Sequence, residues 1–324
     1  MPPAPFILAV DPAPLPDALT GAVVAIGNFD GVHRGHIAVI ARAKALAQKL
    51  GRPCAVLTFE PHPSDYFLGP KTIFRLTPCE TKAVALERLG LVGMIVLRFD
   101  SGLAQLSAED FVADILVKRL KVAAVVAGYD FHFGKARAGT PAFLVEAGKR
   151  AGFAVEIVEK INADASGSIE ATSSTATRAA LEDGDVARAA HLLGHPYFVI
   201  GEVIHGDKRG RTIGFPTANL RLDPSSRLRH GVYVVEVQIE GTRYGGVANF
   251  GRRPTFDNGA PLLEVFIFDF AGDLYGRTIE VDFLDFIRGE QKFASFDELK
   301  RQIKADEASA REILQKMGRV SSGA

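Results

Sequence analysis

Short apolar runs alternate with helix-like stretches through roughly the first 160 residues of the chain. This alternation of strand and helix patterns is typical of a parallel sheet wrapped by helices. The first four runs are apolar almost throughout, as expected for strands buried on both faces. The predicted strands are residues 22–27, 54–59, 93–99, 122–128 and 154–160.

Three helices can be bounded from the signals at their ends. One is predicted to begin after Gly35 and to stop at Gly51, a residue type that commonly follows the last helical turn. Another is predicted to open at Ser107, where an acidic residue three positions later makes an approximate capping box. A last helix is predicted over roughly residues 176–193, because Gly194 and a proline just beyond it form a stop signal.

From residue 197 onward the hydrophobic period changes to that of strands, with every second position apolar. Glycine, aspartate and proline turns separate these runs, which predicts an antiparallel barrel. Residues 296–317 are predicted to form a closing helix, after which the last residues should fray. The predicted barrel strands are residues 197–204, 231–241, 244–251, 262–270 and 278–286.

The change of period divides the chain into two predicted domains of different class, residues 1–185 and 186–320. A length of 324 residues agrees with about two domains, and 47% hydrophobic residues supply two cores. Lys+Arg and Asp+Glu both total 38, so the basic footprint of a general nucleic-acid binder is missing, although a local cluster could still hold a small anion.

The remaining bulk features favour a reducing, cytoplasmic setting. Two cysteines give no disulfide framework, and no apolar run reaches the roughly 18 residues that span a bilayer. The N-terminal stretch lacks a basic region and is broken by prolines, so no secretory signal is expected.

The most informative short stretch is GNFDGVHRGH, residues 27–36, which lies between a predicted strand and a predicted helix. Its histidines, His33 and His36, do not have the spacing of a helical zinc motif, and no further Cys/His cluster follows. Ordinary solvated histidines are the simplest alternative. However, a strand–helix junction is a natural phosphate site, and glycines allow close approach of a ligand. Imidazoles that donate hydrogen bonds to phosphoryl oxygens are therefore the favoured interpretation.

The pattern HxGH within this stretch is the hallmark of the nucleotidyltransferase superfamily. The longer string, followed by TFEPHP at residues 58–63, resembles the FMN adenylyltransferase half of bacterial bifunctional riboflavin kinase/FAD synthetases. The resemblance implies a Rossmann-like fold in which His33 and His36 stabilise the α- and β-phosphates of ATP while the FMN phosphate attacks the α-phosphorus. It also implies a nucleotide pocket that includes Gly27, Asn28, Phe29, Asp30 and Gly35.

Residues 127–139, AGYDFHFGKARAG, resemble the family's GxDFxFG segment, with Asp130 as a nucleotide-binding residue. His132 stands where an arginine is usual, and Thr140 where Asn or Asp commonly follows. In a purely structural interpretation, the two phenylalanines of the segment fill the core around a turn. This interpretation is compatible with a nucleotide-binding role of the same segment.

Residues 172–178, TSSTATR, resemble the family's ISSTxIR motif. The resemblance implies phosphate contacts at a helix N-terminus from Ser173, Ser174, Thr175 and Arg178. The alternative is an ordinary Ser/Thr helix cap. Thr172 and Thr177 replace apolar residues of the motif, which motivates the alternative of a weakened adenylyltransferase.

A second candidate site begins at residues 206–220, GDKRGRTIGFPTANL. It is no Walker A loop, because the spacing is one residue short, an arginine takes the lysine position and Pro216 prevents a following helix. Thr217 and Asn219 lie two positions apart and so share one face if the chain is extended. Their oxygens suit Mg²⁺. The basic residues of the loop could neutralise nucleotide charge or simply form a solvated turn.

This string resembles the riboflavin kinase family almost letter for letter, and the resemblance extends through residues 246–256 and 262–276. It implies that Thr217 and Asn219 coordinate Mg-ATP in a barrel domain with a closing helix. The nucleotide-binding residues implied with them are Gly206, Lys208, Gly214 and Pro216.

Glu264 takes the family's catalytic base position, beside the ribityl 5′-hydroxyl, although an outward-facing strand carboxylate is the simpler interpretation. Its apolar neighbours argue for a role. Phe266 departs from a histidine that is frequent there. Residues 286–293 resemble the segment that contacts flavin, which implies that Arg288 and Glu290 meet the isoalloxazine ring, with Gly289 a small departure.

Together these motifs predict a bifunctional enzyme. Riboflavin and ATP give FMN and ADP, then FMN and ATP give FAD and pyrophosphate, both with Mg²⁺. The expected partners are these small molecules, without nucleic acid or membrane, in a possible homo-oligomer. Three alternatives remain: a kinase with a weakened or lost adenylyltransferase, a flavin-sensing binding protein, and a tRNA-charging enzyme, which would need a basic RNA-facing region.

Overall fold

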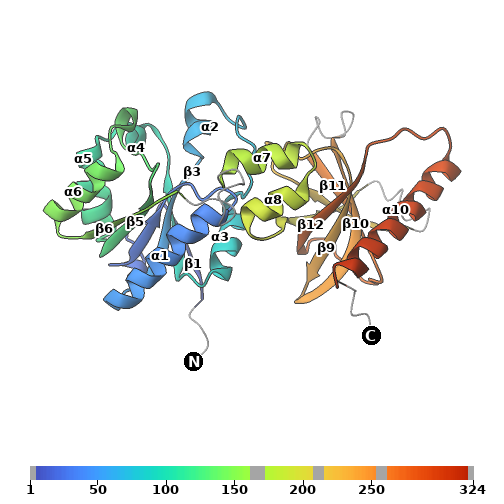
Figure 1. Cartoon of the computed structure of the whole chain (residues 1–324), viewed down its shortest axis with the longest axis horizontal. Helices are drawn as coiled ribbons and strands as arrows, with labels where there is room; N and C mark the ends of the chain where they lie inside the picture. Colours follow the sequence, from blue (N-terminus) through green and yellow to red (C-terminus); the bar gives the residue numbers. More distant parts are fainter. Residues whose placement is uncertain (1–4, 161–171, 207–214, 253–260, 320–324) are drawn as a thin grey trace. The chain divides into compact units, whose positions relative to one another are not determined.

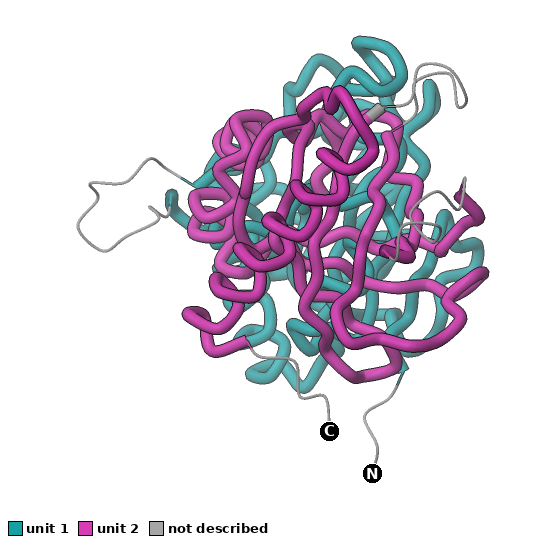
Figure 2. Tube along the Cα trace, turned by 90° about the vertical axis from the view of Figure 1, so that its right-hand side faces the viewer, with its two compact units in different colours: residues 1–73, 77–173 teal, residues 74–76, 174–324 magenta. Residues whose placement is uncertain are grey.

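The computed structural model describes residues 5–160, 172–206, 215–252 and 261–319, and the chain forms two compact units (Figure 1, Figure 2). The first unit comprises residues 1–73 and 77–173, and the second comprises residues 74–76 and 174–324. The predicted domain boundary near residue 185 stays a prediction.

The first unit is built on a six-stranded parallel sheet with the order β1-β4-β3-β2-β5-β6. The five strands predicted from the apolar runs are confirmed, and the central ones are buried except at the last residue of three of them. The first strand was missed, because its four apolar residues form only a short run within a proline-rich stretch. The strands are β1 (Ile7–Val10), β2 (Val23–Ile26), β3 (Cys54–Glu60), β4 (Gly93–Arg98), β5 (Ala124–Gly128) and β6 (Ala154–Val158).

Helices connect these strands. The predicted stop of α1 at Gly51 is confirmed, since Gly51 adopts the left-handed conformation with φ 62°. The predicted start after Gly35 is wrong: α1 begins one residue before that glycine, because the imidazole of His33 acts as its N-cap. The predicted cap at Ser107 is confirmed by a 3.0 Å bond from the N–H of Asp110. The helical segments are η1 (Asp17–Leu19), α1 (Arg34–Leu50), α2 (Pro63–Leu68), α3 (Cys79–Arg88), α4 (Ser101–Gln105), α5 (Ala108–Asp110), the π-helix η2 (Phe111–Arg119), η3 (Lys135–Arg137) and α6 (Pro141–Ala151).

The second unit contains a closed antiparallel barrel with the order β10-β11-β8-β7-β12-β9, as the period-two pattern predicted. Its interior is filled by alternate apolar side chains of every strand. The predicted closing helix is confirmed as α10 (Phe296–Lys316), whose Ala310 and Leu314 pack on the outer face of the barrel. The strands are β7 (Tyr197–Ile204), β8 (Thr217–Arg221), β9 (Gly231–Ile239), β10 (Thr242–Arg252), β11 (Pro261–Ile267) and β12 (Thr278–Gly289).

The prediction of one helix over residues 176–193 is wrong, because two helices occupy this stretch. They are α7 (Ser174–Glu182) and α8 (Val186–Leu193). Gly184 turns the chain with φ 79°, and the carboxylate of Asp185 accepts a 2.9 Å bond from the N–H of Arg188 and so caps the second helix. The predicted stop at Gly194 is confirmed. In the part of the chain that the structure describes, no helix has the length and apolar character needed to cross a membrane.

A buried carboxyl in the barrel wall makes the stability of the protein depend on pH. Asp282 on β12 is buried beside Glu280 and Glu236, with Arg243 nearby, and its burial raises the pKa of the carboxyl to about 6. The folded protein therefore keeps this proton at a pH where the unfolded chain has released it, so that rising pH favours unfolding.

Burial raises the pKa of the Asp282 carboxyl from 3.8 to about 6. As the pH rises from about 4 to about 6, we therefore expect the free energy of unfolding to fall by about 2–3 kcal/mol. Asp282→Asn should remove this slope. Urea denaturation of both proteins from pH 4 to pH 8 measures it, and a stability difference that does not change with pH would contradict the expectation.

Candidate functional site

The loop between β2 and α1 lies at the carboxyl edge of the parallel sheet, as the sequence predicted. Two bonds to one threonine fix it: Thr77 N–H donates to Asp30 Oδ1 over 2.9 Å, and Gly31 N–H donates to Thr77 Oγ1 over 2.8 Å. Asp30, which was predicted to line the nucleotide pocket, is 1% exposed. Its carboxylate therefore anchors the loop.

The rings of His33, the N-cap of α1, and His36, in the first turn of α1, stack at a centroid distance of 3.6 Å. His33 Nδ1 accepts a 3.3 Å bond from the backbone N–H of His36. Neutral His33 consequently carries its ring hydrogen on Nε2, where it can donate to a ligand. The ring of Phe29 lies 5.1 Å from that of His36 and supports the pair from the side.

Glycines let these rings pack close against the backbone. A Cβ on Gly35 would lie 3.0 Å from Cε1 of His33 and 3.4 Å from Oγ1 of Thr172, so the glycine lets the histidine approach the start of the TSST segment. A Cβ on Gly27 would lie 3.3 Å from the ring of Phe29. The structure thus brings together the histidines, the glycines and Thr172, which the sequence placed in separate motifs.

The GYDFHFG segment follows β5, the strand that pairs with β2, so Asp130 lies exposed at the same edge of the sheet. His132 Nδ1 donates to the carbonyl oxygen of Asp130 over 2.9 Å. Phe133 is buried in the core, as the structural interpretation of this segment expected. Thr140 caps α6 by accepting from the N–H of Phe143, which gives this departure from the family pattern a local purpose.

Ser174 begins α7, so Ser174, Thr175 and Arg178 lie in the first turns of a helix. Ser173 directly precedes that helix. Arg178 Nε donates to the carbonyl oxygen of Phe74 over 2.7 Å, within the second unit. Thr177 is fully buried where the family pattern has an apolar residue.

The second candidate site lies on the outer face of the barrel. Glu264 of β11 stands in register with Asn219 of β8 on one side and with Asn249 of β10 on the other. Its neighbours Leu263 and Val265 point into the barrel core, so Glu264 points outward, where it is half-buried. The outward orientation and the chemical role are therefore compatible. Asn249 also contributes a polar side chain to this row. No role for it was predicted from the sequence.

Asn219 supplies an unusual acceptor. The residue is 5% exposed, its Nδ2 donates to the carbonyl oxygen of Thr217 over 3.3 Å, and its Oδ1 has no hydrogen-bond partner within the described ranges. Buried acceptors are rarely left without a partner, and an amide oxygen is a normal ligand of a hard cation. Pro216 is exposed just before β8, whereas Lys208 and Gly214 lie outside the described residues.

Gly206 packs directly on this amide, because a Cβ at that position would lie 2.5 Å from Nδ2 of Asn219. We expect Gly206→Ala to displace the amide and to slow FMN formation from riboflavin about tenfold, the loss expected when a bound group moves by a fraction of an ångström. Mg²⁺ titrations of FMN formation measure it. FAD formation from supplied FMN is the internal control, and an unchanged Mg²⁺ dependence would count against a role for this pocket.

Arg288 and Glu290, predicted to meet a flavin ring, have protein partners. Arg288 Nη2 donates to Asp306 Oδ2 over 2.7 Å and its Nε to Oδ1 over 3.0 Å, which ties β12 to α10. Glu290 Oε2 lies 3.6 Å from His230 Nδ1, and a Cβ on Gly251 would lie 2.5 Å from Glu290 Oε1. Their flavin contacts stay a prediction.

Exposed aromatic rings gather on α2, a feature that sequence reasoning missed. Tyr66, Phe67 and Leu68 are 38%, 66% and 69% exposed, and the rings of Tyr66 and Phe67 lie 5.4 and 5.8 Å from that of Phe99. Exposed apolar clusters of this kind often mark binding surfaces, and such rings can stack on a planar ligand. The apolar triplet directly after PHPSD is the sequence signal that could have identified them.

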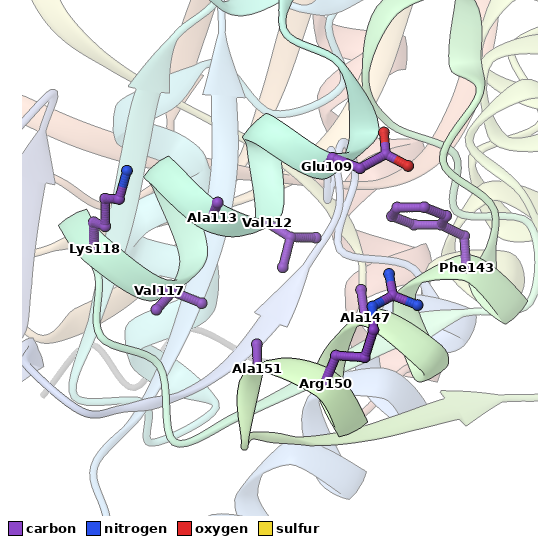
Figure 3. A pocket seen from close by; sticks show the side chains of 9 residues that line it. All are labelled: Glu109, Val112, Ala113, Val117, Lys118, Phe143, Ala147, Arg150 and Ala151. Carbon is purple, nitrogen blue, oxygen red and sulfur yellow. The ribbon is translucent and has the colours of Figure 1, made fainter.

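A separate groove of about 360 Å³ lies between η2 and α6 (Figure 3). Apolar side chains such as Val112 and Phe143 line it, with Lys118 and Arg150 beside them. It contains none of the predicted site residues. Across the residues that the structure describes, no cluster of three or more His, Cys, Asp or Glu side chains could hold a metal.

Comparisons with known proteins assign both halves of the chain. A model of the FAD synthetase family matches residues 15–175, and a model of the riboflavin kinase family matches residues 193–314. Proteins named bifunctional riboflavin kinase/FMN adenylyltransferase are similar throughout. The one from Haemophilus influenzae is 45% identical over 90% of this chain and 94% of its own, and the one from Bacillus subtilis is 42% identical over 89% and 91%.

A solved structure from Streptococcus pneumoniae is similar as well, with a TM-score of 0.77 and 38% identity over 90% of this chain and 94% of that one. That protein is named a macrolide-efflux protein, a name that differs from those of the relatives above.

Proposed function

The chain belongs to the bifunctional riboflavin kinase/FMN adenylyltransferase family, and from this premise we propose how its residues divide the two reactions. The protein is an enzyme that converts riboflavin and ATP into FMN and ADP, and FMN and ATP into FAD and pyrophosphate. The first unit matches the FAD synthetase family and the second the riboflavin kinase family.

For adenylyl transfer, His33 and His36 donate hydrogen bonds to the α- and β-phosphates of ATP as negative charge develops on them. The N-cap bond of His33, which leaves Nε2 as the donor, is the observation that carries this assignment. The N-terminus of α1 gives the phosphates a favourable dipole. The FMN phosphate oxygen attacks the α-phosphorus, and pyrophosphate leaves. The aromatic rings on α2 offer a surface for the flavin.

For the kinase reaction, Glu264 accepts the proton of the ribityl 5′-hydroxyl while that oxygen attacks the γ-phosphorus of ATP and ADP leaves. The row of Asn219, Glu264 and Asn249 across three strands supports this assignment, because it places a carboxylate between two amides that can position substrate groups.

Asn219 and Thr217 would hold Mg²⁺ together with the nucleotide phosphates. The buried Oδ1 of Asn219 fits this ion, and the bound ion would offset the charge of the polyphosphate. A cytoplasmic location, the lack of nucleic-acid partners and a possible homo-oligomer remain predictions.

A chromatographic product assay tests the proposal. Purified protein is incubated with ATP, Mg²⁺ and either riboflavin or FMN. We expect FAD in both reactions and no product when Mg²⁺ is removed by a chelator. FMN from riboflavin without FAD in either reaction would reduce the protein to a kinase. No turnover at all would favour a flavin-sensing protein instead.

A further inference from the structure

Lys82 of α3 is among the largest fully buried side chains of the chain, with 1% of its surface exposed. Its ammonium group donates to Glu60 Oε1 over 3.2 Å and lies 3.4 Å from Thr58 Oγ1. A lysine is rarely buried to this degree, because its charge loses the hydration of water. The reactions described above assign it no role.

The hydrogen bonds around Lys82 have a fixed direction. An ammonium group only donates, so Thr58 Oγ1 accepts from Lys82, and its own hydrogen is donated to the carbonyl oxygen of Asn28 over 3.1 Å. Thr58 is itself fully buried. A buried cation is thus connected through one hydroxyl to the backbone of the GNFDGVHRGH loop.

This connection reaches the loop next to a residue with an unfavourable backbone conformation. Phe29, the next residue, adopts φ 49°, a conformation that side chains other than glycine rarely take and that the surroundings must hold in place. The bond from Thr58 fixes the peptide between Asn28 and Phe29 on one side. The bonds of Thr77 to Asp30 and Gly31 fix the loop on the other.

The ring of Phe29 lies 5.1 Å from that of His36, which stacks on His33. The peptide that Thr58 holds therefore directly precedes the residue whose ring lies beside the histidine pair. We propose that Lys82 is a positioning residue for adenylyl transfer: through Thr58 and the Asn28 carbonyl it holds Phe29 and, with it, the stacked histidines in the geometry that the phosphates require. This inference rests on the proposed phosphate role of His33 and His36.

Two substitutions test the connection at different points. Lys82→Met removes the cation, and Thr58→Val removes the hydroxyl while it leaves Lys82 beside Glu60. The kcat of FAD formation from FMN is expected to fall about tenfold to a hundredfold in each, as small misplacements of catalytic groups do, with KM for ATP little changed. The double variant should be no slower than the slower single variant, because both interrupt one connection.

Controls separate this role from a loss of folding. Arg42→Met removes another cation that pairs with a carboxylate, Glu156, but at an exposed place, and should leave FAD formation unchanged. FMN formation from riboflavin should stay at the wild-type rate in every variant, and thermal unfolding reports the folded fraction. Should Lys82→Met fail to fold, Thr58→Val alone decides.

Several results would overturn the inference. These are wild-type kcat in a folded Thr58→Val protein, a loss of rate proportional to the loss of folded protein, and effects that multiply in the double variant. His36→Ala, measured alongside, distinguishes a failure of the proposed histidine role from a failure of the proposed role of Lys82. An active His36→Ala protein refutes the proposed role of the histidines, whereas an inactive one beside an active Thr58→Val protein refutes only the role of Lys82.

Discussion

Glu264→Gln is expected to abolish FMN formation from riboflavin while FAD formation from supplied FMN continues at the wild-type rate. Glutamine keeps the shape of the side chain and its place in the row with Asn219 and Asn249. It cannot accept the proton of the ribityl hydroxyl. General bases commonly contribute about 10²- to 10⁴-fold to a rate, so kcat should fall by that factor. Because binding groups remain, KM for riboflavin should change far less.

The measurement is the initial rate of FMN formation in the presence of saturating ATP and Mg²⁺. Glu202→Gln is a matched control, since Glu202 is an exposed carboxylate on β7 of the same barrel, outside the row of Glu264. An equal loss of FMN and FAD formation in Glu264→Gln would contradict the assignment of two independent sites. An undiminished kinase rate would show that another group takes the proton.

Most strands of both units were readable from the sequence because each of them repeats one simple rule, whereas the short strands β1 and β8 were not predicted. The central parallel strands are almost entirely apolar, and the barrel strands alternate apolar and polar residues. The exceptions follow from other interactions. The stretch from Ser174 to Leu193 has a continuous helical pattern, yet Gly184 and the Asp185 cap divide it. Residues Phe74 and Leu76, from within the sequence of the first unit, belong to the core of the second.

In the candidate sites, too, local features could be predicted from the sequence and long-range contacts could not. Motifs predicted roles for the histidines, Asn219 and Glu264, since these residues stand in short segments that resemble the family. Partners distant in sequence were not predictable. Asp30 is held by Thr77, and Arg288 by Asp306, because the fold brings together segments that no local pattern connects. Burial of Lys82 is of this kind too, since one lysine on an amphipathic helix carries no signal of its own.

His36→Ala is expected to give the reverse of the Glu264 result. FAD formation from FMN should fall about 10²- to 10³-fold, the usual cost of removing one donor to a developing charge, and the kinase should be unaffected. The loss also removes the ring on which His33 stacks, so both imidazoles lose their fixed geometry. His191→Ala, on the exposed face of α8, is the matched control. The decisive measurement is FAD formation at saturating FMN and ATP. A large fall in kinase rate would show that the two sites are not independent, and a retained adenylyltransferase rate would remove the histidine pair from the mechanism.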